Sequence, residues 1–570
     1  MKQNRHFFRL LNICSKHFIY LLLIFSATYN LTAQQPTVGL LQYSQTDQQE
    51  GYVLFAPMFS TTTYLIDKCG NSVHKWESMY KPGLSVYLLP DGSILRTGNV
   101  DNPVFKIGGG GGGIIERIAW DGTLLWSYSI SDNKNCQHHD IYPLPNGNVL
   151  AIVWEAKNYN DVVRAGRDTA ITNQSSWFDK IVEISPTGLN TGDVVWQWSS
   201  WDHLVQENDQ EKSNYYTVSE EPQRININYT TDNTHKISEW LHFNSLDYNP
   251  DLDQILISAY GFGEIWVIDH STTTEQAASH SGGKYEKGGD LIYRWGNPAA
   301  YDMGTRNDRK LFGQHSARWI KNGLKDGGKI MVFNNGVGRR NATYSSVDII
   351  TPPVESSGKY YLDKSVGYGP DNQEWIYTDS INGGFSAANY SSAERLPNGN
   401  TLVCVGPVGY FFEVTPDNKH VWKYVNPVSI LGVAKQGDNV AGNSAFRSEF
   451  YPANFPGFAG RDLSSGTPIE LEPYPSLCLT TSVASDDEVK TAGVFPNPAN
   501  QVLQVQYAKS NNEYVEITLI NSLGEVVRKQ TSASTDGTCT IDVQDVANGM
   551  YQIKIFNGLK TTVELVVIAR

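Results

Sequence analysis

A short turn-and-strand unit recurs along this chain, and it limits the fold more than any other feature. Residues 89–95 (LPDGSIL) recur at 144–150 (LPNGNVL) and at 396–402 (LPNGNTL). Asp-Gly or Asn-Gly supplies the left-handed residues of a tight turn, and the aliphatic and β-branched residues that follow favour a strand. The repeat therefore predicts β-hairpins at three well-separated places.

A second unit places a turn before an aromatic strand. It occurs at 120–126 (WDGTLLW) and 415–422 (TPDNKHVW), and 195–198 (VWQW) follows a similar turn at 186–188. Hairpins at this density, without a long 3.6-residue periodicity, predict an antiparallel all-β fold. Repeated four-strand units favour a β-propeller over a sandwich, and residues from about 50 to 430 would hold about six blades with long polar loops at about 205–235 and 351–390.

The composition supports a globular body and excludes some partners. Hydrophobic residues make up 40% of the chain, and 14 Trp and 31 Tyr side chains can bury large areas. The formal net charge of -14 argues against nucleic acid or an anionic membrane as the partner. A local site can still be positive, since a few arginines are enough to make one.

The N-terminus has the pattern of a secretory signal. Lys2, Arg5 and Arg9 precede an apolar run at 18–25, and residues 31–33 (LTA) offer small side chains for cleavage. We predict a signal peptide at 1–33. No later stretch is apolar enough to span a bilayer, so we expect no transmembrane segment in the mature chain.

The cysteines fit an oxidising compartment. Six are present, and five remain after the predicted signal is removed. A bridge between Cys69 and Cys478 would tie the two ends of the body together, although spacing alone does not establish this pairing. No CxxC or His/Cys spacing suggests structural zinc, and the glycine run at 108–113 lacks the Lys-Ser/Thr of a phosphate-binding loop. We predict neither a metal nor a cofactor.

The character of the chain changes after residue 475. We expect the main domain at 34–475, a polar linker at 476–492, and a small β-sandwich with Gly/Asn turns at 493–570. Its motifs FPNPA (495–499), INSLGE (520–525) and NGMY (548–551) resemble the C-terminal sorting domain of the type IX secretion system. The resemblance implies contact with that machinery, export through the periplasm to the cell surface or medium, and removal of the domain. An ordinary sandwich used for binding is the alternative.

Three separate stretches hold the polar residues most suited to chemistry, at 240–244 (WLHFN), 313–319 (GQHSARW) and 334–339 (NNGVGR). Alternation along a strand would place Trp240, His242 and Asn244 on one face. Gathered at strand ends, His242, His315 and Arg339 would suit an anionic, oxygen-rich substrate, because imidazole exchanges protons near neutral pH and arginine binds sulfate-like oxygens. Buried anchoring histidines and a solvated arginine are the alternatives.

The pair His138-His139, followed by Asp140, precedes a strong strand–turn–strand unit. Neighbouring His-His-Asp side chains cannot easily converge on one metal ion. We expect one histidine of the pair to face the propeller axis and to form hydrogen bonds there. A histidine with a purely structural role is the other interpretation.

Together these stretches resemble the arylsulfate sulfotransferase family, which consists of bacterial six-bladed propellers that use no nucleotide sulfate donor. The resemblance covers about residues 50 to 430 and includes GYVLFAP (51–57), TTTYLID (61–67), HHD (138–140), WLHFNS (240–245), YRWG (293–296), QH (314–315) and FNNGVGR (333–339). It implies that a histidine takes the sulfuryl group from a phenolic sulfate and passes it to a second phenol. His242, His315 and Arg339 would be catalytic, and His139, Asn244, Asn335 and Trp240 would bind the substrate.

The chain departs from the family in one respect. The family's nucleophilic histidine follows the arginine segment, but no histidine lies between His315 and His420 here, and residues 390–400 (YSSAERLPNGN) occupy the corresponding stretch. Three interpretations follow. His242, His315 or His139 accepts the sulfuryl group, or transfer between substrates is direct, or the propeller only binds. We expect sulfuryl transfer between phenols, with an aryl sulfate hydrolase and a surface module binding a sulfated or anionic aromatic or glycan ligand as alternatives.

Overall fold

The computed structural model describes residues 35–570 except 107–108, 173, 232–237, 341–343, 381–383, 479–491, 508–513, 522–523, 534–536 and 557–560. The signal peptide predicted at 1–33 lies outside the described residues, as does most of the predicted linker. The chain forms two compact units, divided after Cys478. In the described part, no helix is long and apolar enough to cross a membrane.

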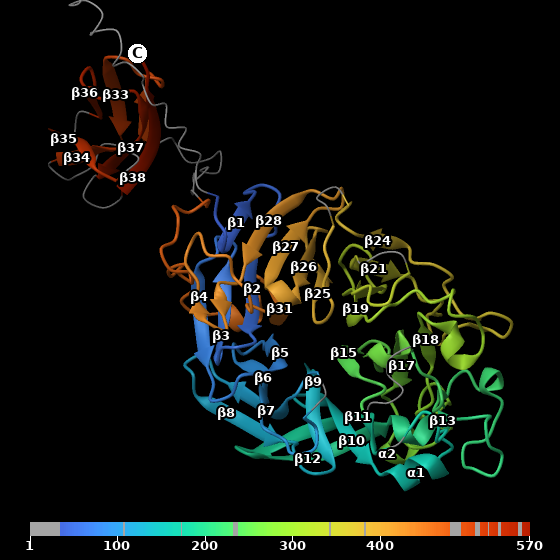
Figure 1. The fold of residues 1–570 in the computed structure, drawn as a ribbon. Coiled ribbons are helices and arrows are strands. Elements are labelled where there is room, and N and C mark those ends of the chain that lie inside the picture. The colour runs from blue at the N-terminus through green and yellow to red at the C-terminus, as the bar shows by residue number, and fades with distance from the viewer. Residues whose placement is uncertain are drawn as a thin grey trace, which may run out of the picture. The chain divides into compact units, whose positions relative to one another are not determined.

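Among the described residues, six antiparallel sheets of four or five strands form the body of the first unit (Figure 1). From the axis outward they are β31-β2-β3-β4 (Ala445–Pro452, Gly51–Pro57, Thr62–Asp67, Ser72–Glu77), β5-β6-β7-β8 (Pro82–Leu88, Ile94–Asn99, Gly113–Ile118, Leu124–Ser129), β9-β10-β11-β12 (Asn135–Pro143, Val149–Lys157, Ser176–Gly188, Thr191–Ser199), β15-β16-β17-β18 (Phe243–Asn249, Gln254–Ala259, Glu264–Asp269, Tyr293–Trp295), β19-β20-β21-β24 (His315–Trp319, Ile330–Asn334, Ser346–Ile350, Trp375–Tyr377) and β25-β26-β27-β28-β1 (Ser392–Arg395, Thr401–Val405, Tyr410–Val414, His420–Val425, Gly39–Tyr43).

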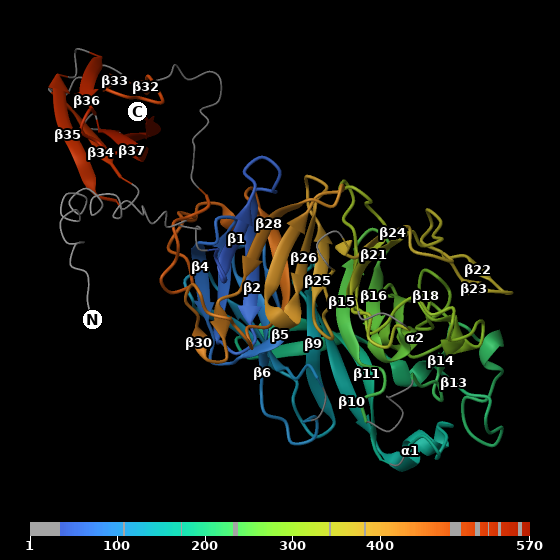
Figure 2. The same ribbon diagram turned by 45° about the horizontal axis from the view of Figure 1, so that its top comes forward.

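The innermost strands of successive sheets contact one another around a closed ring, from β31 through β5, β9, β15, β19 and β25 back to β31 (Figure 1). Figure 2 shows β5, β9, β15 and β25 of this ring in a tilted view. This arrangement is the predicted six-bladed propeller. Both ends of the body close the ring, because β31 completes the blade that begins with β2, and β1 adds an outer strand to the blade that ends with β28.

The sequence repeats occupy equivalent positions in the blades. Each LPDG or LPNG unit is the turn between the first and second strands of a blade, and Gly92, Gly147 and Gly399 have φ of 81°, 88° and 86° there. The turns at 120–122 and 415–418 join the third strand of a blade to the fourth, whereas residues 186–188, expected as a turn, end β11, and the connection to β12 lies at 189–190. The segment 351–390, predicted as a loop, also contributes β24 as the outer strand of the fifth blade.

The innermost strands are irregular at one end. In β9, residues 138–140 lie between Gln137 and Ile141, which pair with Val153 and Ala151 of β10. β5, β15, β19 and β31 are shifted in register in the same way. A bulge of this kind bends a strand and re-aims side chains, so each of these blades can direct extra side chains toward the axis.

Short elements fill the connections between strands. They are α1 (Tyr159–Arg164), η1 (Ser200–His203), β13 (Leu204–Val205), η2 (Val218–Glu220), β14 (Ile225–Asn226), η3 (Tyr260–Phe262), α2 (Thr274–Ala277), η4 (Pro298–Tyr301), β22 (Leu362–Asp363), β23 (Gly367–Tyr368), η6 (Gly406–Val408), β29 (Val428–Ser429), β30 (Gly432–Val433) and η7 (Pro456–Phe458).

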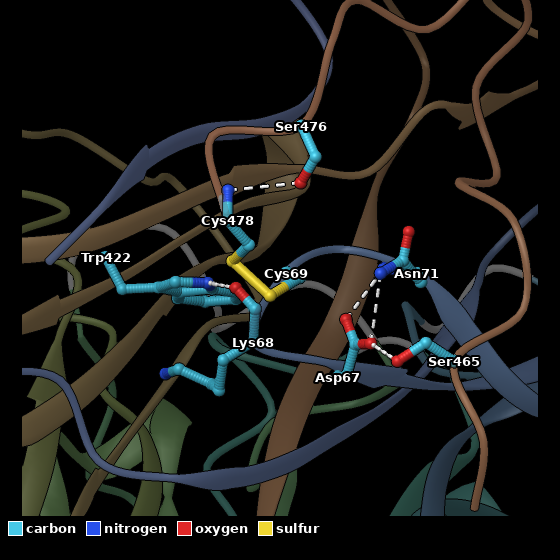
Figure 3. Close-up of a disulfide and its surroundings, with 8 residues drawn as sticks. All are labelled: Asp67, Lys68, Cys69, Asn71, Trp422, Ser465, Ser476 and Cys478. Atoms are coloured by element: carbon cyan, nitrogen blue, oxygen red, sulfur yellow. Dashed lines mark hydrogen bonds between the residues drawn. A yellow bond between two sulfur atoms is a disulfide. The ribbon is translucent and has the colours of Figure 1, made fainter. Parts of the chain in front are cut away.

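A disulfide between Cys69 and Cys478 joins the start of the body to its end, as predicted (Figure 3). The adjacent Lys68 contributes to the same junction. Its carbonyl accepts a hydrogen bond from Trp422 Nε1 at 2.7 Å, and its ammonium lies 2.7 Å from the buried Glu413 carboxylate. Cys136, Cys404 and Cys539 are free and buried.

The second unit is a small β-sandwich. One sheet consists of β32, β33 and β36 (Ala492–Phe495, Val502–Tyr507, Thr538–Asp542), and the other of β35, β34, β37 and β38 (Val526–Ala533, Tyr514–Ile520, Gly549–Phe556, Thr561–Ile568). Alternate residues such as Leu503, Val505, Ile517 and Ile553 are fully buried between the sheets. Period-two burial of this kind is what two packed antiparallel sheets require.

Candidate functional site

Three imidazoles gather where the innermost strands of the third, fourth and fifth blades meet. His139 lies in the bulge of β9, His242 directly precedes β15, and His315 begins β19. The rings of His139 and His242 are 4.6 Å apart, and Tyr260 lies 4.8 Å from His242 and 5.8 Å from His315. The structure thus brings together the two predicted catalytic histidines and the predicted axial one.

His139 and His242 are held by unusual backbone. Their φ angles are 50° and 54°, a left-handed conformation that non-glycine residues adopt at a cost. Such conformations persist where the surrounding structure enforces them, and they cluster at functional sites. In the fifth blade the left-handed residue is Ser316, with φ 51°, next to His315.

The hydrogen bonds of His315 fix its tautomer. Its Nδ1 lies 2.8 Å from Asn335 Oδ1 and 3.1 Å from the Gly313 carbonyl. The Asn335 amide nitrogen donates to the carbonyls of Ala387 and Tyr390, so its oxygen must face the imidazole. Nδ1 therefore carries the proton. Burial, the largest cause, lowers the pKa of His315 to about 3, so the ring is neutral and Nε2 has a free lone pair.

His139 ends a chain of three titratable groups. Asp179 Oδ1 lies 2.7 Å from His138 Nε2, and His138 Nδ1 lies 2.8 Å from His139 Nδ1. Burial, with a contribution from the Glu239 carboxylate, raises the pKa of Asp179 well above its usual range, while burial lowers the pKa of both histidines.

These shifts favour one set of proton positions. A protonated Asp179 would hold its proton on Oδ1, 2.7 Å from His138 Nε2, and it accepts the Phe243 N–H at Oδ2, 3.3 Å away. His138 would then carry its own proton on Nδ1 and donate it to Nδ1 of His139, which leaves the proton of His139 on Nε2. We call Asp179, His138 and His139 the relay. Its end at the axis is a hydrogen-bond donor, whereas His315 presents a lone pair.

His242 is the most accessible of the three rings, with 19% of its side chain exposed. Its Nδ1 lies 2.8 Å from Oε1 of Glu239, which is 8% exposed. Each imidazole thus has its Nδ1 occupied by a partner behind it. In the described part of the chain, no protein group forms a hydrogen bond with any of the three Nε2 atoms.

Aromatic side chains and glycines surround the imidazoles. The Phe446 ring lies 6.3 Å from that of His139 and 6.0 Å from that of Tyr390. The described end of the glycine run packs directly on His139, because a Cβ on Gly110 would lie 2.1 Å from the imidazole Cε1. The run is thus a close-fitting wall of the site, which only glycine permits.

Arg447, which the sequence analysis did not single out, is the arginine whose charge acts on two of the imidazoles. The Arg447 side chain is 2% exposed, and its guanidinium lies 2.6 Å from the Asp140 carboxylate. It contributes to the lowered pKa of both His139 and His315. Arg339, predicted as the sulfuryl clamp, bonds instead to Tyr344 O and Ser346 Oγ at 3.3 Å each. Within the described residues, its contacts do not reach the imidazoles.

The predicted shared face of Trp240, His242 and Asn244 is wrong. β15 begins only at Phe243, and the left-handed backbone at His242 breaks the alternation on which the prediction depended. Trp240 is 2% exposed and packs in the core against Phe178 and Phe262. Asn244 is fully buried and donates to the carbonyl of Gln314 at 2.8 Å, so it supports the backbone that leads into His315.

Tyr390 begins the stretch in which a late histidine was expected. It lies two residues before the innermost strand of the sixth blade, and its φ of 54° equals that of His242. Burial raises its pKa. His420 is remote from this position, since it belongs to β28 and bonds to Tyr377 and Asp379.

A protein-family comparison decides the assignment. The model of the arylsulfotransferase family matches residues 115–443, more than half of the chain. The chain belongs to the arylsulfotransferase family. A second model, the secretion system C-terminal sorting domain, matches residues 493–569. The chain therefore carries the type IX sorting domain that its C-terminal motifs predicted, which implies export to the cell surface or medium.

Other comparisons contribute less to the picture of this arylsulfotransferase-family chain. No curated protein matches it in sequence. A Bacteroides caccae protein of unknown function is similar at 11% identity and a TM-score of 0.37, over 70% of this chain and 98% of that one. A catalytically inactive virginiamycin B lyase from Staphylococcus aureus is similar at 10% identity and a TM-score of 0.31, over 69% and 89%. Likeness at this level does not bear on function.

Sequence reasoning missed several residues of the site. Glu239 is next to a motif that had been singled out, and Tyr390 heads the stretch that lacks a histidine, so both had a usable signal. Asp179 and Arg447 had none, because they lie in ordinary strands far from every motif. Strand pairing within the third blade brings Asp179 near His138, and the closed ring of blades brings Arg447 near Asp140.

Proposed function

We propose that this protein transfers a sulfuryl group from an aryl sulfate to a phenol, with His315 as the group that carries it. The observation behind this proposal is the difference between neighbouring rings. His315 has a free lone pair on Nε2, and His139 has a proton on Nε2 that Asp179 can replace. A nucleophile beside an acid is what cleavage of an aryl sulfate ester requires.

In the first half-reaction, His315 Nε2 attacks sulfur and the bond from sulfur to the phenolic oxygen breaks. The leaving oxygen takes the proton from His139 Nε2. The proton on His138 then moves to His139 and that on Asp179 moves to His138, so the carboxylic acid is the net proton source. The sulfated imidazolium keeps its Nδ1 proton, which Asn335 and the Gly313 carbonyl stabilise.

In the second half-reaction, the acceptor phenol loses its proton to His139 Nε2, and the relay returns a proton to Asp179. The phenolic oxygen attacks sulfur, the nitrogen–sulfur bond breaks, and His315 is neutral again. The relay loses one proton in the first half-reaction and regains one in the second, so the protons balance over the cycle. The cycle uses no cofactor. The relay thus serves as acid in one half and as base in the other.

Negative charge on the sulfuryl oxygens is stabilised during transfer by hydrogen-bond donors that are already positioned around them. His242 faces the same space from the fourth blade, and the Glu239 carboxylate behind it stabilises positive charge that develops when the ring donates to a sulfuryl oxygen. Arg447 adds a fixed positive charge nearby. Tyr260, Phe446 and Tyr390 offer ring faces for the aromatic part of donor and acceptor.

A chromogenic aryl sulfate, supplied with and without an acceptor phenol, tests the proposal. We expect turnover that depends on the acceptor, and a loss of about 10³-fold or more in His315→Ala, because the covalent route is removed. His74→Gln is the matched control, since this histidine lies on β4, at the outer edge of the first blade, and its loss should leave turnover unchanged.

Three other outcomes would replace the proposal. Sulfate release without an acceptor indicates a hydrolase. Binding of the aryl sulfate without turnover indicates a non-catalytic surface module. Full acceptor-dependent activity in His315→Ala excludes His315 as the carrier. For the export route, we infer passage through the periplasm and removal of the sorting domain, which the mass of the exported protein tests.

A further inference from the structure

A second cluster of histidines lies near the outer strands of the third and fourth blades, away from the imidazoles at the axis. His203 ends η1, which follows the outer strand β12, and His280 and Asp290 lie in the connection between β17 and β18. Their ligand atoms all lie within 4.8 Å of one another. Among the described residues, no other group of three or more His, Cys, Asp or Glu side chains meets this condition.

The hydrogen bonds of His203 leave an electrostatic conflict. Its Nε2 lies 2.8 Å from the carbonyl oxygen of Ala277, which can only accept, so Nε2 carries the proton. In a neutral ring, Nδ1 is then an acceptor, yet it lies 2.9 Å from Oδ1 of Asp290. Two acceptors at this distance repel unless a cation lies between them or a second proton is bound.

His280 converges on the same oxygen. Its Nδ1 lies 2.7 Å from Asp290 Oδ1. The other carboxylate oxygen faces Arg224, whose Nε is 4.0 Å away. One divalent metal ion bound by both Nδ1 atoms and Oδ1 would occupy the space in which these three acceptor atoms face one another, and it would attract the lone pair of each.

We propose that His203, His280 and Asp290 bind one Zn²⁺ ion. Two imidazole nitrogens and a carboxylate oxygen are ligands that zinc accepts, with a water in the fourth position. The Ala277 carbonyl behaves as the outer partner that metal-binding histidines usually have, since it fixes the ring and leaves the other nitrogen unprotonated.

The surroundings hold the buried ligands in place. Trp198 stacks on His203 with ring centroids 5.6 Å apart, and its Nε1 donates to the Gly289 carbonyl at 2.6 Å. A Cβ on Gly289 would lie 2.5 Å from His203 Nε2, so glycine is required beside this ring. The His280 side chain is 45% exposed, which gives the metal a path from solvent and lets this ligand adjust.

A neighbouring histidine shows the contrasting arrangement. His270 lies 2.7 Å from Asp253 through Nδ1 and 3.0 Å from Glu183 through Nε2. These two carboxylates outweigh burial and raise the pKa of His270 to about 9, so both nitrogens are donors and no lone pair remains for a metal. His270 therefore provides a matched control.

The test measures zinc in the untagged full-length protein after loading with Zn²⁺ and desalting, by elemental analysis, with affinity from chelator competition. We expect about one zinc per chain, and a loss of affinity of about 100-fold or more in His280→Ala and Asp290→Asn. His270→Ala should keep the zinc. Zinc should also raise the melting temperature of the parent protein but not that of His280→Ala.

His280→Ala is the decisive variant, because an exposed side chain can be removed without threatening the fold. Circular dichroism establishes that the variant is folded. The proposal is overturned if the parent protein binds no zinc, or if folded His280→Ala binds it as tightly as the parent does. Arylsulfotransferase activity is not a readout here, so the outcome is independent of the function proposed above.

Discussion

At the scale of the residue, the site depends on what lies behind each imidazole. Three similar rings have different partners: an amide for His315, a second imidazole for His139 and a carboxylate for His242. The partner determines which nitrogen carries the proton, and so whether a ring attacks or donates. In the proposed mechanism, the role of each ring is therefore set by the residue behind it.

Asp179→Asn tests the relay at this scale. The amide can still occupy the carboxyl position, but it has no proton to release. We expect kcat/KM to fall by about 10²-fold or more for aryl sulfates with weakly acidic leaving phenols, and by little for nitrophenyl sulfate, whose phenolate leaves without an acid. A series of substituted phenyl sulfates measures this.

A uniform loss across that series would contradict the relay, because it would indicate a general disturbance of the site. Folding is monitored separately by thermal unfolding. The matched variant is Glu239→Gln, which alters a carboxylate behind His242 instead. It should lower activity evenly across leaving groups, since it acts on the sulfuryl oxygens and not on the leaving phenol.

At the scale of the element, the innermost strands create the site through their irregularities. The bulge in β9 and the left-handed residues before β15 and β25 turn His139, His242 and Tyr390 out of the ladder. A regular strand would alternate its side chains between its two faces. The glycine segment before β7 then approaches the displaced imidazoles closely.

Gly110→Ala tests this close approach. Gly110 has φ of 115°, and an added Cβ would lie 2.1 Å from His139 Cε1, so we expect His139 to be displaced and kcat to fall by about 10²-fold. Gly122→Ala is the control, because that glycine also has a positive φ, 86°, but an added Cβ meets nothing within 4 Å.

Both variants should lose stability through their backbone conformation, by about 1 kcal/mol. Only Gly110→Ala should lose turnover at temperatures where the protein remains folded. Equal activity losses in the two variants would show that the glycine wall has no special relation to His139. Steady-state kinetics and thermal unfolding of the same preparations separate the two effects.

The sequence predicted the blades far better than the site. Repeated turns such as Leu89 to Gly92 report local backbone preferences, which a sequence shows directly. The contact of His138 with Asp179 depends on the bulge in β9, and the approach of the glycine segment to His242 depends on how the blades are arranged around the ring. Alternation therefore placed Trp240 on the wrong face, and a motif match assigned Arg339 a role for which the structure offers Arg447 as another candidate.

At the scale of the whole molecule, the ring must close for the site to exist. The imidazoles come from three blades, while Arg447 comes from β31 near the end of the body. β31 pairs with β2, and the disulfide between Cys69 and Cys478 joins the same two ends of the chain. Ring closure and assembly of the candidate site are thus linked through the blade that holds both ends of the body.

Removing the disulfide tests this link. Its cysteines are 409 residues apart, and we expect a Cys69→Ser/Cys478→Ser variant to lose about 2–5 kcal/mol of unfolding free energy, because the unfolded chain gains freedom. Urea unfolding measures the change. A reductant should destabilise the parent protein but not this variant, and an equal effect on both would show that the bridge contributes nothing.

The most direct test of the account is to locate the sulfuryl group. The protein is mixed with an aryl sulfate in the absence of acceptor, quenched at alkaline pH to preserve nitrogen–sulfur bonds, digested and examined by mass spectrometry. The account predicts an added mass of about 80 Da on the peptide that contains His315, lost when a phenol is added before the quench. The same mass on His139, His242 or Tyr390, or no adduct in a protein that turns over, would contradict it.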